Sequence, residues 1–249
     1  MYPRYSYPWR TVLGVGSGIV LGGRRSFRAD ACACLGRLRP ALQVDGAHHI
    51  PSSGPALIVV NHYHRPGFAA WWIALALASV VPAEMHWVMT DEWTCAGKPY
   101  AAAGRAASRW LLRRVSAIYG FTAMPPMPPR PEDAFRRALA VRRMLEFVRV
   151  HPDAILGLAP EGMDTPGGVL SWPAEGTGRL ILHLAGLGFG VVPVGAYEEN
   201  GRLCLRFGPT CRPAPAPGLS GRELDRAAAQ MVMRAIAALL PPPLRGEFA

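Results

Sequence analysis

Short apolar runs alternate with longer helical patterns along most of the chain. The clearest run, Ala-Leu-Ile-Val-Val at residues 56–60, is continuously apolar and β-branched, which predicts a strand buried on both faces. Similar runs predict strands at 42–46, 85–90, 115–121, 154–158, 190–195 and 203–207. Pro193 lies inside one of them, and a proline there predicts an edge strand or a bulge.

Helical patterns fill the intervals between these strands. Residues 68–80 are small or apolar on every side, which predicts a helix that is buried or lies against a membrane. Further helices are expected at 105–114, from Pro131 to about 149, at 175–187 and at 222–240. Strands that alternate with helices predict a single α/β domain, with a mainly parallel mixed sheet covered by helices.

The two ends of the chain differ from this alternating centre. Residues 1–41 begin with an aromatic arm and continue as a weak helical segment, broken at Gly22-Gly23, which we expect to lie at a membrane interface. Residues 42–212 form the α/β domain, and residues 213–249 form a proline-rich linker and a closing helix. Since no run reaches the ~20 apolar residues that span a bilayer, we expect peripheral or monotopic association.

Composition narrows the class of partner. Half of the 249 residues are hydrophobic, which supports a sizeable core, and the net charge of +10 suggests an anionic partner such as a membrane surface. Only Lys98 is a lysine, so the many arginines reflect coding bias rather than bidentate recognition. No nucleic-acid motif accompanies the charge, so we expect no nucleic acid. The five cysteines form no CxxC pair, so we expect no metal site.

Candidate chemistry lies directly after the central strand, where Asn61 and His62 stand between the strand and the apolar helix. Ligands of open α/β sheets bind at the carboxyl ends of the strands. A neutral imidazole there can take a proton from a substrate hydroxyl. The alternative is that His62 only caps the strand. Asp91-Glu92 and Pro160-Glu161-Gly162 also follow predicted strands, so we expect them at the same rim of the sheet.

These blocks, with their order and spacing, resemble the glycerolipid acyltransferase family, which includes the 1-acylglycerol-3-phosphate acyltransferases. The resemblance covers about residues 42–209, and its most specific part is Pro160-Glu161-Gly162 followed by the segments 167–172, 176–180 and 191–194. It implies that a lipid hydroxyl attacks an acyl thioester, either acyl-CoA or acyl carrier protein, with no other cofactor. It also implies that His62 takes the hydroxyl proton and that Glu161 and Gly162 help to build the acceptor site.

The sequence departs from the family where an Asp should follow the His by five residues, because that position is Gly67. The family's Asp holds the imidazole in its useful tautomer. Making the corresponding Asp of a serine-protease triad an amide costs about 10⁴ in rate. Another group must therefore take its place, or the chemistry is slow or lost. The candidates are Asp91, Glu92, Glu161, Asp164 and His64, of which we favour Glu161.

A second departure removes positive charge from the acceptor site. Met163-Asp164 stands where the family has Thr-Arg, and residues 121–124 lack the family's phosphate-binding Arg. Arg65, close to a helix start, could compensate in part. The expected substrate-binding residues are Asn61, His64, Arg65, Pro160, Gly162 and Asp164.

Two functions follow from this reading. The first is an acyltransferase at the cytoplasmic face of the membrane, which acylates a lysophospholipid or similar glycerolipid with His62 as general base. The second is a catalytically impaired protein of the same fold, which binds lipid or membrane without turnover.

Overall fold

One sheet organises the molecule. The computed structural model describes residues 2–93 and 100–249, and over these ranges it contains seven strands in the order β1-β7-β6-β2-β5-β3-β4. Their bounds are Gln43–Asp45 (β1), Ala56–Val60 (β2), Met85–Thr90 (β3), Thr122–Met124 (β4), Ile155–Leu158 (β5), Gly190–Glu199 (β6) and Arg202–Phe207 (β7). Every neighbouring pair is parallel except β6 and β7. This confirms the predicted single α/β domain with a mainly parallel mixed sheet.

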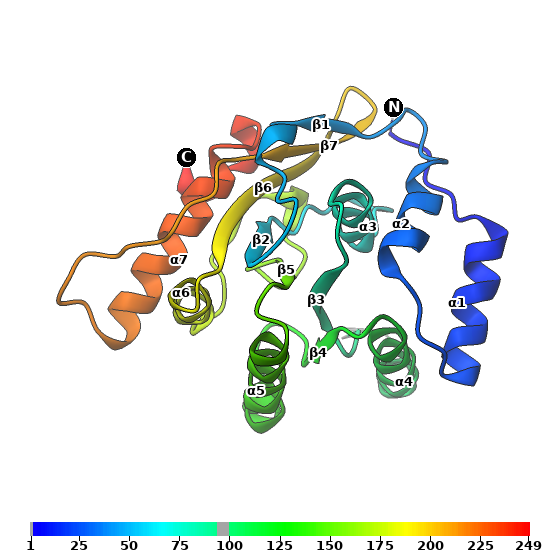
Figure 1. Cartoon of the computed structure of the whole chain (residues 1–249), viewed down its shortest axis with the longest axis horizontal. Helices are drawn as coiled ribbons and strands as arrows, with labels where there is room; N and C mark the ends of the chain where they lie inside the picture. Colours follow the sequence, from blue (N-terminus) through cyan, green and yellow to red (C-terminus); the bar gives the residue numbers. More distant parts are fainter. Residues whose placement is uncertain (1, 94–99) are drawn as a thin grey trace.

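Helices cover both faces of this sheet (Figure 1). Their bounds are Trp9–Leu21 (α1), Phe27–Leu35 (α2), Trp71–Val80 (α3), Ala101–Tyr119 (α4), Ala134–Val150 (α5), Thr177–Gly186 (α6) and Gly221–Ala237 (α7). α2 packs on α3 on one side, and α6 packs on α7 on the other, with α7 against β6 and β2. α4 and α5 flank the end of the sheet formed by β4. All five residues of β2 are buried, as its apolar run predicted.

The sequence interpretation of residues 115–121 as a strand is wrong. These residues belong mostly to the last turns of α4, which ends at Tyr119 and is capped by Gly120 with φ 72°, and the strand β4 begins only at Thr122. The buried face of α4 includes Ser108, Leu112 and Ser116, so its helical period is concealed when serine is counted as polar. Each serine hydroxyl is satisfied by the carbonyl three residues earlier, at 3.0 and 2.9 Å.

Pro193 does not lie on an edge strand, because β6 stands between β7 and β2. The alternative expectation was a bulge, and the structure places it in the segment after β7, which faces β6. Val194 pairs with Phe207 whereas Val191 pairs with Cys211, so residues 208–210 face only residues 192–193. The additional residue in the partner strand removes the need for a regular ladder bond from the nitrogen of Pro193.

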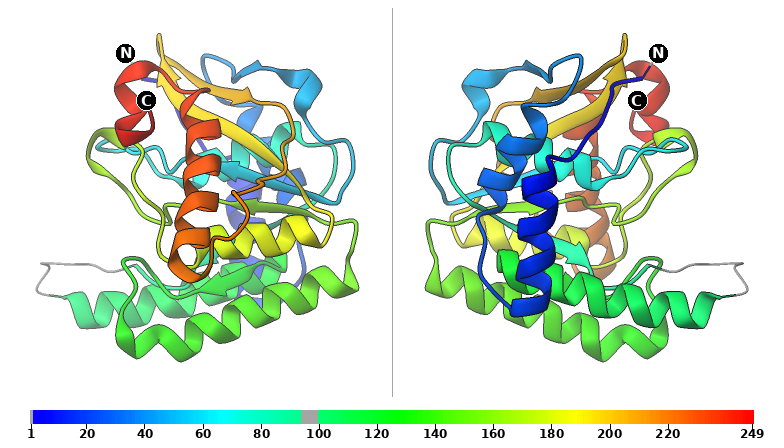
Figure 2. Two further views of the ribbon diagram at one scale, coloured as in Figure 1. Left: turned by 90° about the vertical axis from the view of Figure 1, so that its left-hand side faces the viewer. Right: turned by 90° about the vertical axis from the view of Figure 1, so that its right-hand side faces the viewer.

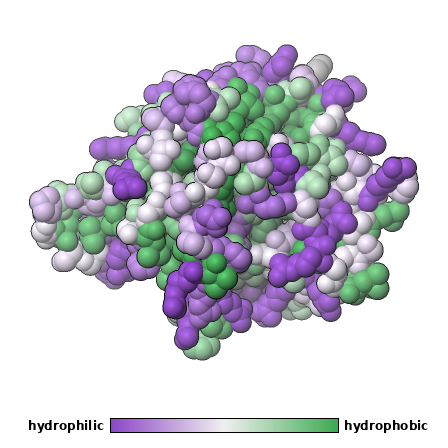
Figure 3. Space-filling view, in the orientation of Figure 1, coloured by the Kyte–Doolittle hydropathy of each residue, from purple (hydrophilic) through white to green (hydrophobic). Residues whose placement is uncertain are grey.

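The N-terminal segment adds an outer layer. α1 ends at Gly22, at the break that the sequence predicted, and crosses α4 at the edge of the molecule (Figure 2). Apolar side chains at its outer end stay exposed, including Val20 at 72% and Leu21 at 83%. Figure 3 shows hydrophobic surface at the corner of the molecule where α1 lies. Within the described ranges, every helix is too short or too polar to cross a bilayer.

Candidate active site

The carboxyl ends of neighbouring parallel strands meet at one rim of the sheet. Val59 of β2 lies opposite Leu158 of β5 and Pro193 of β6, and β3 runs parallel to β5 on its other side. The chain segments that follow β2, β3 and β5 therefore leave the sheet on the same side. This confirms the shared rim that the sequence predicted.

Asn61 fixes the start of the segment that carries His62. Its amide nitrogen donates to the carbonyl of Ala196 at 2.8 Å, and its amide oxygen accepts from the N–H of the same residue at 2.7 Å. The side chain is almost fully buried, and this pair of hydrogen bonds ties it to β6. The structure therefore gives Asn61 a bracing position rather than the substrate contact expected from the sequence.

Glu161 holds the backbone of two loops together. Its carboxylate accepts from the N–H of His62 at 2.6 Å and from the N–H of Ser171 at 2.9 Å. Burial raises the pKa of Glu161, whereas these two N–H groups act in the opposite direction because they stabilise the ionised form. We expected Glu161 to orient the His62 ring. In the structure, its carboxylate binds the main chain of His62.

Asp164 is the acid that meets the ring. Its Oδ1 lies 3.0 Å from Nδ1 of His62 and 3.4 Å from Nδ1 of His64. The oxygen is displaced from the hydrogen-bond direction of the His62 nitrogen, so the two atoms are in close contact without an aligned hydrogen bond. The contact with His62 lowers the pKa of Asp164, and a partly exposed carboxylate is thereby kept ionised beside two imidazoles.

The position five residues after His62 offers nothing to the ring. Gly67 has φ 77°, and among the described residues a Cβ built there would have only Nη1 of Arg65 within 4 Å, at 3.8 Å. Asp164 reaches His62 from a different loop, the one that follows Pro160-Glu161-Gly162. The acid beside the His62 ring therefore comes from another segment of the rim.

Arg65 faces away from this pair. Its guanidinium forms a two-pronged ion pair with the buried Glu198, in which Nη2 donates to Oε1 at 2.8 Å. The ring of Tyr2 covers its other side at 3.7 Å, and Tyr5 donates to the same Glu198 at 2.6 Å. Arg65 therefore fastens the N-terminal arm to β6 and is not available as the phosphate ligand that we expected.

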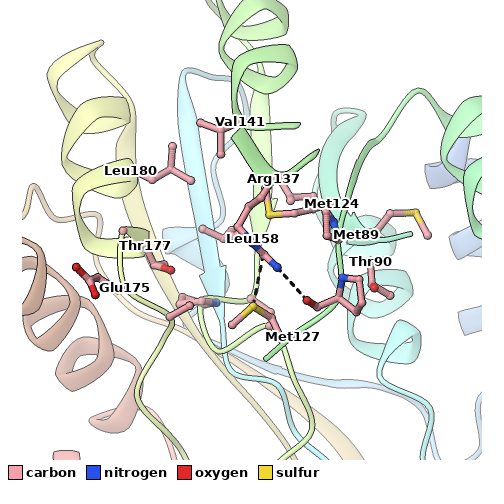
Figure 4. Close-up of a pocket in the computed structure, with 18 of the residues that line it drawn as sticks. Met89, Thr90, Met124, Met127, Arg137, Val141, Leu158, Glu175, Thr177 and Leu180 are labelled. Atoms are coloured by element: carbon pink, nitrogen blue, oxygen red, sulfur yellow. Dashed lines mark hydrogen bonds between the residues drawn. The ribbon is translucent and has the colours of Figure 1, made fainter. Parts of the chain in front are cut away.

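An apolar cleft of about 480 Å³ opens beside the rim (Figure 4). It lies between α5 and α6, with residues of β3, β4 and β5 forming its base. Pro160 and Gly162 line one end of the cleft, and Gly162, with φ 66°, packs so closely on Met127 that a Cβ would lie 2.9 Å from its side chain. The Pro160-Glu161-Gly162 turn therefore borders the cleft on one side and holds His62 through Glu161 on the other.

A cluster of buried ion pairs at the end of β3 was not foreseen. Asp91, Glu92 and Asp133 are each at most 4% exposed. They pair with arginines from two segments, namely Arg109 and Arg113 of α4 and Arg130 and Arg136 around the start of α5. The i, i+4 spacing of the α4 arginines predicts a common face, but it does not show which acids that face meets. Asp91 and Glu92 are thus structural, and neither orients His62.

The arrangement resembles a solved structure. The fold is similar to the crystal structure of the 1-acyl-sn-glycerophosphate (LPA) acyltransferase PlsC from Thermotoga maritima, with a TM-score of 0.53 and 16% identity over 93% of this chain and 86% of that chain. The chain has an acyltransferase fold. No family model matches the sequence, and no curated protein matches it. At this identity the likeness establishes the fold, and the chemistry must be argued from the residues themselves.

The described residues contain no group of three or more His, Cys, Asp or Glu side chains placed to hold a metal ion. An imidazole with a carboxylate partner can itself move a proton. The histidine, its acid and the adjacent apolar cleft are therefore the groups from which a function has to be built.

Proposed function

We propose that the protein transfers a fatty acyl group from a thioester, acyl-CoA or acyl carrier protein, to a hydroxyl of a lysophospholipid or similar glycerolipid. The observation that carries the proposal is the position of Asp164, 3.0 Å from Nδ1 of His62, at the rim beside an apolar cleft. With Nδ1 facing a carboxylate, Nε2 is the ring nitrogen left to accept a proton from the acceptor hydroxyl.

The proposed step needs one base and one acid. The hydroxyl oxygen attacks the thioester carbon while His62 Nε2 takes its proton, and the charge on the imidazolium is stabilised by Asp164. When the C–S bond breaks, the thiolate leaves with that proton. Asp164 and His62 can tighten into an aligned hydrogen bond once substrate is present, since catalytic contacts are often loose in a free enzyme.

The surroundings of the pair support a lipid substrate. The cleft presents mostly Met, Leu, Val and Pro side chains, which suit an acyl chain. α1 presents exposed apolar residues that favour a peripheral position at the cytoplasmic face of a membrane, where both substrates would be found. Glu161 and Gly162 would shape the acceptor site indirectly, through the loop that they hold.

The test is acyl transfer by the purified chain, measured as product by mass spectrometry with mixed acyl thioesters and a panel of lysolipids. We expect acylated product from the wild type and none from His62→Ala. His48→Ala is the matched control, because His48 is an exposed histidine after β1 and does not line the cleft. Undiminished turnover by His62→Ala would reject the assigned base.

Two features of the site favour a second function. The contact between His62 and Asp164 is not aligned as a hydrogen bond, and Gly67 has no side chain that could orient the ring. In that case the protein binds lipid or membrane without turnover. It would be supported if the wild type bound lysolipids yet gave no product with any thioester.

A further inference from the structure

Arg137 carries a charge into the cleft. Its guanidinium donates to the carbonyl of Pro126 at 2.9 Å and to the sulfur of Met127 at 3.5 Å (Figure 4). Beyond it, the cleft is lined by Val141, Leu145 and other apolar side chains. A carbonyl and a thioether use only part of the donor capacity of a guanidinium, and neither neutralises its charge.

Arg137 also lacks a counter-ion. Over residues 2–93 and 100–249 it forms no ion pair, and the segment 94–99 contains no acidic residue. The nearby carboxylates of Asp91 and Asp133 already bind other arginines. Burial is the largest cause that lowers the pKa of Arg137, which shows that its environment disfavours a cation. A partly buried, unpaired charge of this kind is costly unless an anion joins it.

The remaining charges of the cleft do not supply that anion. Glu175 pairs with Arg222 at 2.9 Å, outside the apolar part. Arg179, which also lines the cleft, is a second cation at its rim. The cleft therefore combines an apolar wall with an excess of positive charge.

We propose that the cleft binds a single-chain anionic amphiphile, with its carboxylate or phosphate oxygens on Arg137 and its chain against Val141, Leu145 and Leu158. Guanidinium groups match both anions through paired N–H bonds. A volume of about 480 Å³ is within the range of small-molecule sites. The inference rests on the proposed function in one respect, which is that a lysophospholipid bound in this way would point its glycerol past Gly162 toward His62.

The test is direct binding to the full chain without acyl donor, by calorimetry, at concentrations below micelle formation. The probes share a dodecyl chain and differ in the head, namely dodecyl phosphate, dodecanoate, monododecylglycerol and dodecyltrimethylammonium. We expect the two anions to bind about 10- to 100-fold more tightly than the neutral glycerol ether. A preference for dodecyl phosphate over dodecanoate would identify a lysophospholipid head, and the reverse a fatty carboxylate.

Arg137→Gln should remove the preference for anions and leave the affinity for monododecylglycerol unchanged. Arg143→Gln, an exposed arginine on the same helix, is the matched control and should keep the preference. An Arg137→Gln variant that still prefers anions would overturn the proposal. Val141→Trp gives a second route if the first variant does not fold. It fills the apolar half of the cleft, so anion binding that survives it unchanged would place the site elsewhere.

The outcome is separable from that of the proposed function. Arg137-dependent binding with no acyl transfer would support the amphiphile site and reject the enzyme. If the protein transferred acyl groups but its anion preference did not depend on Arg137, the enzyme would be supported and the amphiphile site rejected.

Discussion

At the scale of single residues, the acid that lies beside the His62 ring, Asp164, comes from a loop distant in the sequence. The resemblance left Asp164 among five candidates but favoured Glu161, because the family places the Pro-Glu-Gly block near the histidine. The choice depended on the direction of each side chain after a turn that contains Gly162 in a left-handed conformation, with φ 66°. That turn directs Glu161 to the main chain of His62 and leaves Asp164 to meet the ring. Sequence spacing carries no such directional information.

Asp164→Asn tests the assigned acid. An amide keeps the size of the side chain but cannot stabilise the imidazolium, so kcat should fall while KM stays close to wild type. We expect a loss of about 10- to 100-fold, smaller than the roughly 10⁴-fold loss in a buried triad, because Asp164 is partly exposed. Steady-state kinetics with the best donor and acceptor would measure it.

Asp153→Asn is the control for this prediction, because Asp153 is an exposed acid in the turn that precedes β5. If both variants turned over like the wild type, Asp164 would be a neighbour of His62 without a role in catalysis.

At the scale of elements, most strands and helices were predictable because their apolar periods are strong. β2 is a fully buried run, and α3 is buried along most of its length. The failure at residues 115–121 had a local cause, since two buried serines on α4 conceal its period. The bulge opposite Pro193 was anticipated only as one of two alternatives, because a proline does not reveal whether its strand has one neighbour or two.

The C-terminal segment makes contacts that no local pattern shows. Phe248 is 4% exposed and packs against Trp172 with ring centroids 4.9 Å apart, and Glu247 accepts from the indole N–H of Trp172 at 2.9 Å. The N–H of Leu170 donates to the carbonyl of Leu244 at 2.9 Å. These contacts cover the loop that carries Asp164, so the closing segment positions that loop.

Phe248→Ala should therefore loosen the loop as well as destabilise the fold. Truncating a fully buried Phe costs about 3–5 kcal/mol, and we expect less here because the residue lies in a short terminal segment. Hydrogen exchange should rise at residues 163–171. In assays at temperatures well below the melting temperature, kcat should be lower than that of the wild type. Phe135→Ala, at an exposed Phe, is the matched control. Wild-type exchange in this loop would show that the C-terminal segment does not position it.

At the scale of the whole molecule, the exposed apolar residues are unevenly distributed. Trp9, Val12 and Leu13 of α1 are more than half exposed, and Trp71 of α3 is half exposed. The chain also carries a formal charge of +10. An apolar helix face on a cationic protein favours an anionic bilayer surface, because burial of side chains and attraction to headgroups add together. The sequence predicted this association from its charge and its N-terminal segment, and the exposed residues of α1 make that helix the one we expect at such a surface.

Replacing Leu13 and Leu21 together by Ser tests this surface. Both side chains lie on α1 and are largely exposed, at 63% and 83%, so folding should depend little on them. Burying a Leu side chain in an apolar phase contributes about 1.5–3 kcal/mol, so the double variant should bind vesicles containing phosphatidylglycerol at least ~10-fold more weakly. Leu187→Ser, at an exposed leucine just after α6, should bind like the wild type.

Co-sedimentation at low and high salt separates the two contributions, since salt weakens only the electrostatic one. If the double variant bound as tightly as the wild type at both salt concentrations, α1 would not be the membrane contact, and the cationic surface or α3 would have to make it.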